Sequence, residues 1–171
     1  MKMAMKEGDL DLAFATAIKE NEDFRCWVLG KTKFRALHAR LMAEEQAAAR
    51  KTAKHWWKHW WCKVPELGRD SETDIFMVFE IAESRRRFAI HVENKTLGGS
   101  FTEKQPESYD FRARHMMKQH RSVFGYSDFD TLLIAPLGFK EKNNEACRAF
   151  GSYIAYEEIA PYVPDFAHAL T

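Results

Sequence analysis

Two acidic side chains and one lysine stand at positions where chemistry can be expected. Asp74 stands near the start of a β-branched and aromatic run, TDIFMVFEI (73–81), and Glu93 and Lys95 lie two residues apart in the next such run, FAIHVENK (88–95). Because side chains alternate along a strand, Glu93 and Lys95 share one face, and hairpin pairing of the two strands brings Asp74 beside them. Two carboxylates that leave room for water are typical of a Mg²⁺ site. An adjacent lysine can orient a water or offset developing negative charge.

This pattern resembles the motif of the PD-(D/E)XK nuclease superfamily, the restriction-endonuclease-like enzymes, in the variant with a Gln-xxx-Tyr helix after the catalytic strand. The matching residues are Asp74, Glu93, Asn94, Lys95, Gln105, Tyr109 and Arg112. The first acid precedes the second by 19 residues, and the resemblance runs from about residue 68 to residue 114. Thr73 stands where the family commonly has proline.

The resemblance implies a role for each matching residue. Asp74, Glu93 and the backbone carbonyl of Asn94 would hold Mg²⁺ or Mn²⁺, and Lys95 would serve the attacking water. The three residues on the following helix, which share one face because of their spacing, would support the pocket or contact DNA phosphates: Gln105, Tyr109 and Arg112. The implied fold is a restriction-endonuclease-like mixed central sheet flanked by helices, and the implied activity is hydrolysis of DNA phosphodiester bonds.

A further acid from the first helix often completes sites of this family. Glu20 and Glu22 are the candidates in this chain, although neither falls on a clearly inward face of its predicted helix.

Each of these residues also has a purely structural interpretation. A Glu-x-Lys pair on a strand is usually a solvent-exposed ion pair that contributes little to stability. His91 lies on the same predicted face as Glu93, where a hydrogen-bonded structural histidine is an alternative to a catalytic one. Tyr109 can equally belong to the core.

A tryptophan-rich run, KTAKHWWKHWWCK (51–63), is predicted to be helical and leaves three interpretations open. Its indoles can pack on the sheet or on a subunit partner, with the lysines in solvent. Alternatively, Lys58 contacts phosphate while Trp57 stacks on a base, as in many nucleic-acid-binding proteins. The third interpretation is a metal site whose ligands would be His55, His59 and Cys62.

A second group of basic residues, Arg85, Arg86 and Arg87, falls at the predicted hairpin turn between the two strands. Arg86 and Arg87 are candidates for DNA contacts, because cations that hold the phosphate backbone suit a site whose acids hold metal. A solvated hairpin tip is the alternative.

The elements that must position these residues alternate in type. The pattern predicts helices over 11–29 and 34–61, strands over 73–81 and 88–95, a helix over 102–121 and a buried strand over 131–137. A short helix over 144–150, a strand around Tyr153 and a terminal helical segment complete the chain. This order indicates a mixed α/β sheet with helices on its faces, in a single domain (1–171) whose first part (1–63) is helical and whose remainder (64–171) is the α/β core.

Composition narrows the class further. The chain has 171 residues, 26 basic against 25 acidic, which excludes a disordered acidic chain or a histone-like polycation. Charge is unevenly distributed, because residues 64–84 carry a net −5 between segments of +7 (31–63) and +5 (85–121). Three cysteines without regular spacing and no long apolar run favour a cytoplasmic protein that does not enter a membrane.

Two function classes remain on the sequence alone. The first is a Mg²⁺-dependent deoxyribonuclease that uses Asp74, Glu93 and Lys95. The second is a catalytically inactive nuclease-fold module that binds DNA or serves an oligomeric assembly. In either class a homodimer is a possible assembly.

Overall fold

In the computed structural model, residues 5–119 and 125–171 are described. The helices are α1 (Glu7–Glu20), α2 (Glu22–Gly30), α3 (Ala43–Ala49), α4 (Gln105–Gln119), α6 (Leu137–Lys142), α7 (Asn144–Cys147), α8 (Tyr156–Ile159) and α9 (Pro164–His168), with a 3₁₀ turn at Pro65–Leu67. The strands are β1 (Ala39–Leu41), β2 (Trp61–Val64), β3 (Arg69–Glu72), β4 (Ile75–Ile81), β5 (Arg87–Asn94), β6 (Asp128–Ala135) and β7 (Ser152–Ala155).

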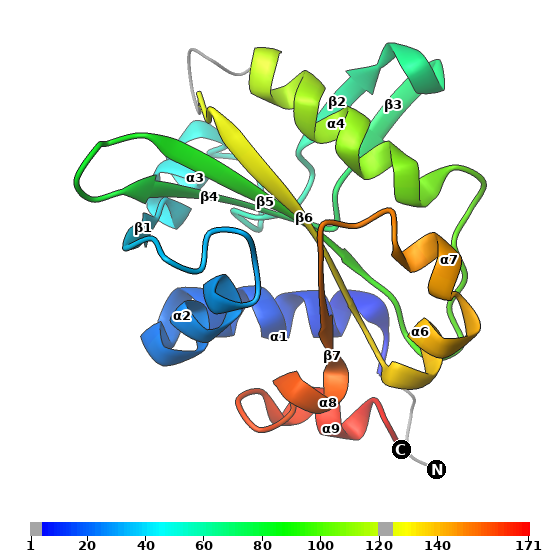
Figure 1. The fold of residues 1–171 in the computed structure, drawn as a ribbon. Coiled ribbons are helices and arrows are strands. Elements are labelled where there is room, and N and C mark those ends of the chain that lie inside the picture. Colours follow the sequence, from blue (N-terminus) through cyan, green and yellow to red (C-terminus); the bar gives the residue numbers. More distant parts are fainter. Residues whose placement is uncertain (1–4, 120–124) are drawn as a thin grey trace.

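A mixed five-stranded sheet with the order β1-β4-β5-β6-β7 organises the fold (Figure 1). The pairs β1–β4 and β4–β5 are antiparallel, whereas β5–β6 and β6–β7 are parallel. Strands β2 and β3 form a separate antiparallel hairpin that leads directly into β4. The predicted α/β architecture with a mixed sheet flanked by helices is confirmed.

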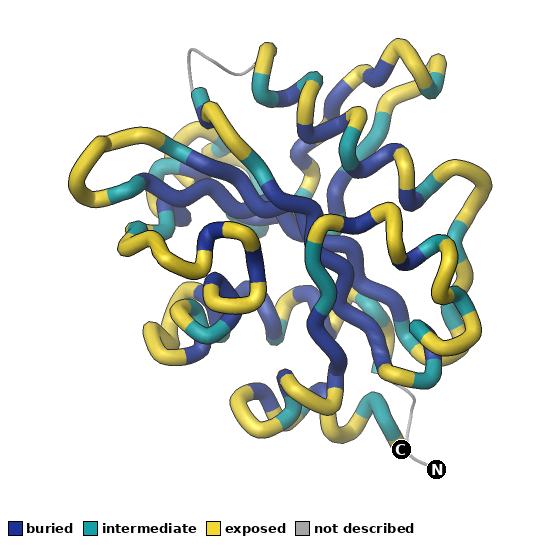
Figure 2. The backbone as a smooth tube through the Cα atoms, viewed as in Figure 1, coloured by how far each residue is buried: buried dark blue, intermediate teal, exposed yellow. Residues whose placement is uncertain are grey.

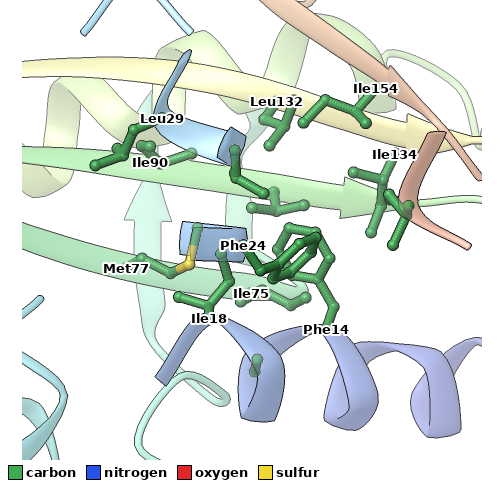
Figure 3. Close-up of a cluster of buried hydrophobic side chains, with 14 of the residues drawn as sticks. Phe14, Ile18, Phe24, Leu29, Ile75, Met77, Ile90, Leu132, Ile134 and Ile154 are labelled. Atoms are coloured by element: carbon green, nitrogen blue, oxygen red, sulfur yellow. The ribbon is translucent and has the colours of Figure 1, made fainter. Parts of the chain in front are cut away.

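Both faces of the central strands are buried, as Figure 2 shows. On one face, Ile75, Met77 and Ile90 pack against Phe14 and Ile18 of α1 (Figure 3). The opposite face is covered by α4, the β2–β3 hairpin and the α6–α7 segment. Alternating side chains of β4 therefore enter two different cores. None of the helices among the described residues combines the length and apolarity that a membrane crossing requires.

Several predicted elements are confirmed with small shifts at their ends. Strands β4, β5 and β6 lie where β-branched and aromatic residues predicted them, and β6 is buried along most of its length. The first predicted helix divides at Asn21, whose side chain accepts the backbone N–H of Phe24 and so begins α2. Helix α4 covers most of the predicted range 102–121, of which residues 120 and 121 lie outside the described part. All three cysteines are free thiols.

The long helix predicted over 34–61 is wrong, and the predicted helical character of 1–63 holds only in part. This segment contains β1, the short helix α3, a run of turns and the start of β2. Trp57 packs with the core on the α1 side of the sheet, whereas Trp60 packs with the core on the α4 side. Burial of the indoles in two separate cores outweighs the helical propensity of the surrounding residues.

The outer edge of β4 is closed by side-chain and loop atoms rather than by a full-length strand. Gln46 of α3 is fully buried; it accepts the N–H of Val78 at 2.9 Å and donates to the carbonyl of Phe76 at 3.1 Å. The other two edge groups are the Phe76 N–H, which donates to the Trp57 carbonyl, and the Val78 carbonyl, which accepts from Met42, both at 2.9 Å. One glutamine thus replaces a strand partner and fixes the segment that precedes the hairpin.

Replacing Gln46 by leucine should destabilise the protein by about 2–4 kcal/mol, because two buried backbone groups of β4 would lose their partners. The free energy of unfolding, measured by urea titration, checks this. Glu44→Ala, an exposed change on the same helix, should alter it by less than about 0.5 kcal/mol. Equal stability of the two variants would contradict the role given to Gln46.

Candidate functional site

The start of β4 and the end of β5 bring the predicted residues together. Ile75 pairs with Val92, so that Asp74 lies opposite Glu93 one step beyond the ladder. Asp74 makes no strand pairing there; instead its Oδ2 accepts the N–H of Asn94 at 3.0 Å. Lys95 follows at once, and its Nζ lies 2.7 Å from Oε1 of Glu93. The predicted hairpin juxtaposition of these residues is confirmed.

Helix α4 holds the Glu93 carboxylate from one side. Gln105 donates from Nε2 to Oε1 at 2.7 Å, and the Tyr109 hydroxyl donates to Oε2. Both residues face the strand because they lie one helical turn apart. Glu93 is completely buried, so its carboxylate keeps one fixed orientation between the helix and Lys95.

Arg112 lies behind Tyr109 rather than at the surface. Its guanidinium carbon is 4.0 Å from the centre of the Tyr109 ring, and Nη1 donates to Oγ of Ser71 on β3. The side chain is 1% exposed, and its Nε and Nη2 have no partner among the described residues. Arg112 therefore supports the tyrosine from within the core and is too deeply buried to reach a phosphate backbone.

The acids that α1 contributes are Glu7 and Asp11, which the sequence reasoning missed. Oδ1 of Asp11 accepts from Nδ2 of Asn94 at 2.7 Å, and Oε1 of Glu7 accepts the N–H of Thr96 at 3.2 Å. Their spacing of four residues places both on one helical face. Two features of the sequence could have identified them: this spacing, and the position of Asp11 beside the apolar stripe that contains Leu10.

Glu20 and Glu22, the acids predicted from the sequence, are exposed near the junction of α1 and α2. Thirteen residues separate Glu20 from Glu7, which is about 20 Å along a helix. The structure does not bring either residue to the cluster, because only the first two turns of α1 lie beside the end of β5.

Negative charge in the cluster exceeds what Lys95 can offset. Burial, and then the neighbouring Asp74, raise the pKa of Glu93 to about 8. Burial, and then Asp74, likewise raise the pKa of Asp11 to about 7, and burial raises the pKa of Asp74 itself. Burial alone would lower the pKa of Lys95, but Glu93 and other carboxylates outweigh this and leave it raised, so that the amine is charged. A bound cation would relieve the remaining repulsion.

The donor set fits a magnesium-type ion. Among the residues that the structure describes, no three Asp, Glu, His or Cys side chains are arranged to hold a metal ion by themselves. Mg²⁺, however, usually takes only one or two carboxylates and keeps several waters. Asp74 and Glu93 supply two, and the carbonyl of Asn94 points to the same side as its N–H, toward Asp74, because both groups of a strand residue face one neighbour.

Of the four residues predicted to contact DNA, Lys58 and Trp57 lie nearest the cluster: the charge of Lys58 partly offsets the rise in the pKa of Asp11, and the Trp57 carbonyl accepts the N–H of Phe76, two residues from Asp74. Trp57 is 2% exposed and cannot stack on a base. Arg86 and Arg87 lie at the far end of the β4–β5 hairpin, about 20 Å from Asp74 along seven strand residues. Arg87 is paired there with Glu80 at 3.4 Å.

The structure supports a structural role for His91 and does not bring His55, His59 and Cys62 together as metal ligands. His91 is fully buried, and its Nε2 lies 3.2 Å from the hydroxyl of Tyr126. His55, His59 and Cys62 do not share a helical face, because no helix forms here. His59 has a left-handed backbone (φ 62°), and Cys62 faces the core beneath α4.

No family model, curated protein or solved structure significantly matches this chain.

Asp11→Asn should stabilise the protein at pH 8 in EDTA by about 1–3 kcal/mol. The pKa of Asp11 is about 7 in the folded protein, above its value in the unfolded chain, so the protonated group favours the folded state. This contribution to the free energy of unfolding is largest below about pH 4 and is lost as the pH rises toward 7. Asparagine does not ionise, so the variant keeps its stability as the pH rises. Its advantage over wild type in the free energy of unfolding should vanish near pH 4. Urea unfolding from pH 4 to 8 measures both. Glu20→Gln, on the same helix, should show no such trend; a less stable Asp11→Asn at pH 8 would contradict the prediction.

Proposed function

We propose that this protein is a Mg²⁺- or Mn²⁺-dependent nuclease of the PD-(D/E)XK superfamily, with a restriction-endonuclease-like fold, that hydrolyses DNA phosphodiester bonds. The observation that carries the proposal is the meeting of Asp74, Glu93 and Lys95 where β4 begins and β5 ends, joined by an acid from α1. The two strands of one hairpin and a helix distant in sequence thus converge on one small group of carboxylates.

The residues that would hold the ion are Asp74, Glu93 and the Asn94 carbonyl, with Asp11 close by. When bound, a divalent ion would lower the pKa of a water and neutralise charge on a phosphate. The raised pKa of Glu93 and Asp11 supports this assignment, because the site is destabilised by its own charge and gains most from a cation.

Lys95 acts as a cation rather than as a base. Its raised pKa keeps the amine protonated at neutral pH, and its Nζ lies 2.7 Å from Oε1 of Glu93, beside the proposed metal site, where it would donate to a water or to a phosphate oxygen. A fixed ammonium group near the reacting phosphate stabilises negative charge that grows in the transition state. Gln105 and Tyr109 are positioning residues that hold Glu93.

A catalytically inactive nuclease-fold module that binds DNA, or that assembles into a homodimer, is the second candidate. The full engagement of Glu93 by Lys95, Gln105 and Tyr109 favours it, because all of these bonds compete with a metal ion for the same two oxygens.

Glu93→Gln and Lys95→Ala should each reduce Mg²⁺-dependent DNA cleavage at least about 100-fold, because one removes a negative ligand and the other the charge-stabilising amine. Gel assays on supercoiled plasmid and on short labelled single and double strands measure this. Glu20→Gln serves as the control and should keep wild-type activity. Cleavage by Lys95→Ala at the wild-type rate, with circular dichroism confirming the fold, would exclude the proposed mechanism.

Titration calorimetry should detect Mn²⁺ or Mg²⁺ binding by the wild-type protein and its loss in Asp74→Asn, because that change removes one of two anionic ligands. Binding should also release protons at pH 7, since Glu93, with a pKa of about 8, is then mostly protonated without the ion and Asp11, with a pKa of about 7, is partly protonated. A protein that binds DNA but shows no affinity for either cation would support the inactive module instead.

A further inference from the structure

Trp61, the first residue of β2, is the most exposed tryptophan of the tryptophan-rich run 51–63. Among the described residues it is 55% exposed, more than any other large apolar side chain, whereas Trp57 and Trp60 are buried. Its strand neighbour Cys62 faces α4, so the indole points to the opposite, open side of the hairpin. Exposing so large an apolar surface has a cost that a bound partner would remove.

The backbone of Trp61 lies close to the carboxylate cluster. Trp61 pairs with Glu72 across the hairpin, and Glu72 is two residues from Asp74. A paired strand residue is at most about 5.5 Å away and two further residues span at most about 7 Å, so the Cα atoms of Trp61 and Asp74 are within about 13 Å. This distance corresponds to a few nucleotides of a stacked strand, which rises about 3.4 Å per nucleotide.

The backbone that presents Trp61 is firmly held. The N–H of His59 donates to Oε1 of Glu72 at 3.1 Å, and Nη1 of Arg50 donates to the carbonyls of Lys58, at 3.3 Å, and His59. The residues on either side of Trp61 are buried. An aromatic surface held in this way binds a flat partner with little loss of conformational freedom.

Charges of both signs surround the indole, because the cross-strand partners of Trp61 and Lys63 are the acids Glu72, which is paired with His59, and Asp70. Lys63 is exposed and shares the face of β2 on which Trp61 lies, because the two residues are two apart. Lys58, three residues before Trp61, lies against the ring of Trp57 at 5.9 Å and close enough to Asp11 to affect its charge. An exposed ring with a lysine on the same face is a combination found in proteins that bind single-stranded nucleic acids, in which bases stack on aromatic rings and phosphates meet cations.

We propose that Trp61 is a stacking site for an unpaired nucleobase, and that the substrate of the neighbouring carboxylate site is a single-stranded or frayed nucleic acid. The substrate assignment rests on the proposed nuclease function, whereas the base-binding site does not require cleavage. Bases inside a duplex are covered by their neighbours and offer no free face to an indole. The Trp61 site therefore distinguishes unpaired from paired strands.

Trp61→Ala should weaken binding of a fluorescein-labelled 12-nucleotide single-stranded DNA about 10-fold, measured by fluorescence anisotropy in EDTA, where no cleavage occurs. Trp61→Phe should retain most of the affinity, and the duplex of the same sequence should bind the alanine variant as it binds wild type. A matched probe with abasic positions should bind wild type and Trp61→Ala equally. The same sequence as RNA shows whether the sugar matters. Tyr162→Ala, an exposed aromatic on the α8–α9 side, is the control and should leave binding unchanged.

Equal affinity of wild type and Trp61→Ala for the single strand would overturn the proposal. So would a sedimentation experiment in which Trp61→Ala dissociates a dimer without changing DNA affinity, because a second copy of the chain would then cover the indole. Weakened binding without any cleavage by the wild type would retain the base-binding site and reject the nuclease function. Cleavage by the wild type, with no effect of Trp61→Ala on binding, would support the nuclease function and reject the base-binding site.

Discussion

The fully buried amide of Asn94 joins segments that are far apart in the chain, and the candidate site depends on it. Its backbone N–H holds Asp74 at the start of β4, and its Nδ2 donates both to Asp11 and to the backbone carbonyl of Glu7 on α1. Its Oδ1 accepts from the hydroxyl of Tyr156 on α8. Because buried polar networks stabilise only when every member is satisfied, this one residue fixes the relative positions of two helices and two strands. The sequence motif had assigned only its carbonyl a role.

Around this amide the fold concentrates carboxylates that water can scarcely solvate. Asp11, Asp74 and Glu93 each have a raised pKa, with Lys95 as the nearest compensating cation. Such an arrangement lowers stability in the absence of a ligand and is usual where function requires it. The apolar packing of β4, β5 and β6 on both faces supplies the stability that tolerates this unfavourable charge.

The parts of the fold that were predictable are those in which local pattern and tertiary packing agree. Strand β4 is rich in β-branched and aromatic residues, β6 contains a continuous apolar run, and the Glu-x-Lys spacing placed Glu93 and Lys95 on one face in advance. The β2–β3 hairpin was missed because Pro65 and Gly68 indicate only a break, and the left-handed Gly68 (φ 63°) completes a turn between strands too short to show alternation clearly. Which end of α1 meets the site depends on its direction across the sheet, which no local pattern encodes.

The closed edge of β4 has a consequence for assembly. Unpaired edge groups are the usual template on which a second chain adds a strand, and long open edges promote aggregation. The N–H and C=O groups of Phe76 and Val78 that face outward are already bonded to Gln46, Trp57 and Met42. A continuous sheet shared between two copies cannot form across this stretch without first displacing α3. Any dimer that uses this side of the molecule must be held by side chains, and the two carboxylate clusters would then remain on separate sheets.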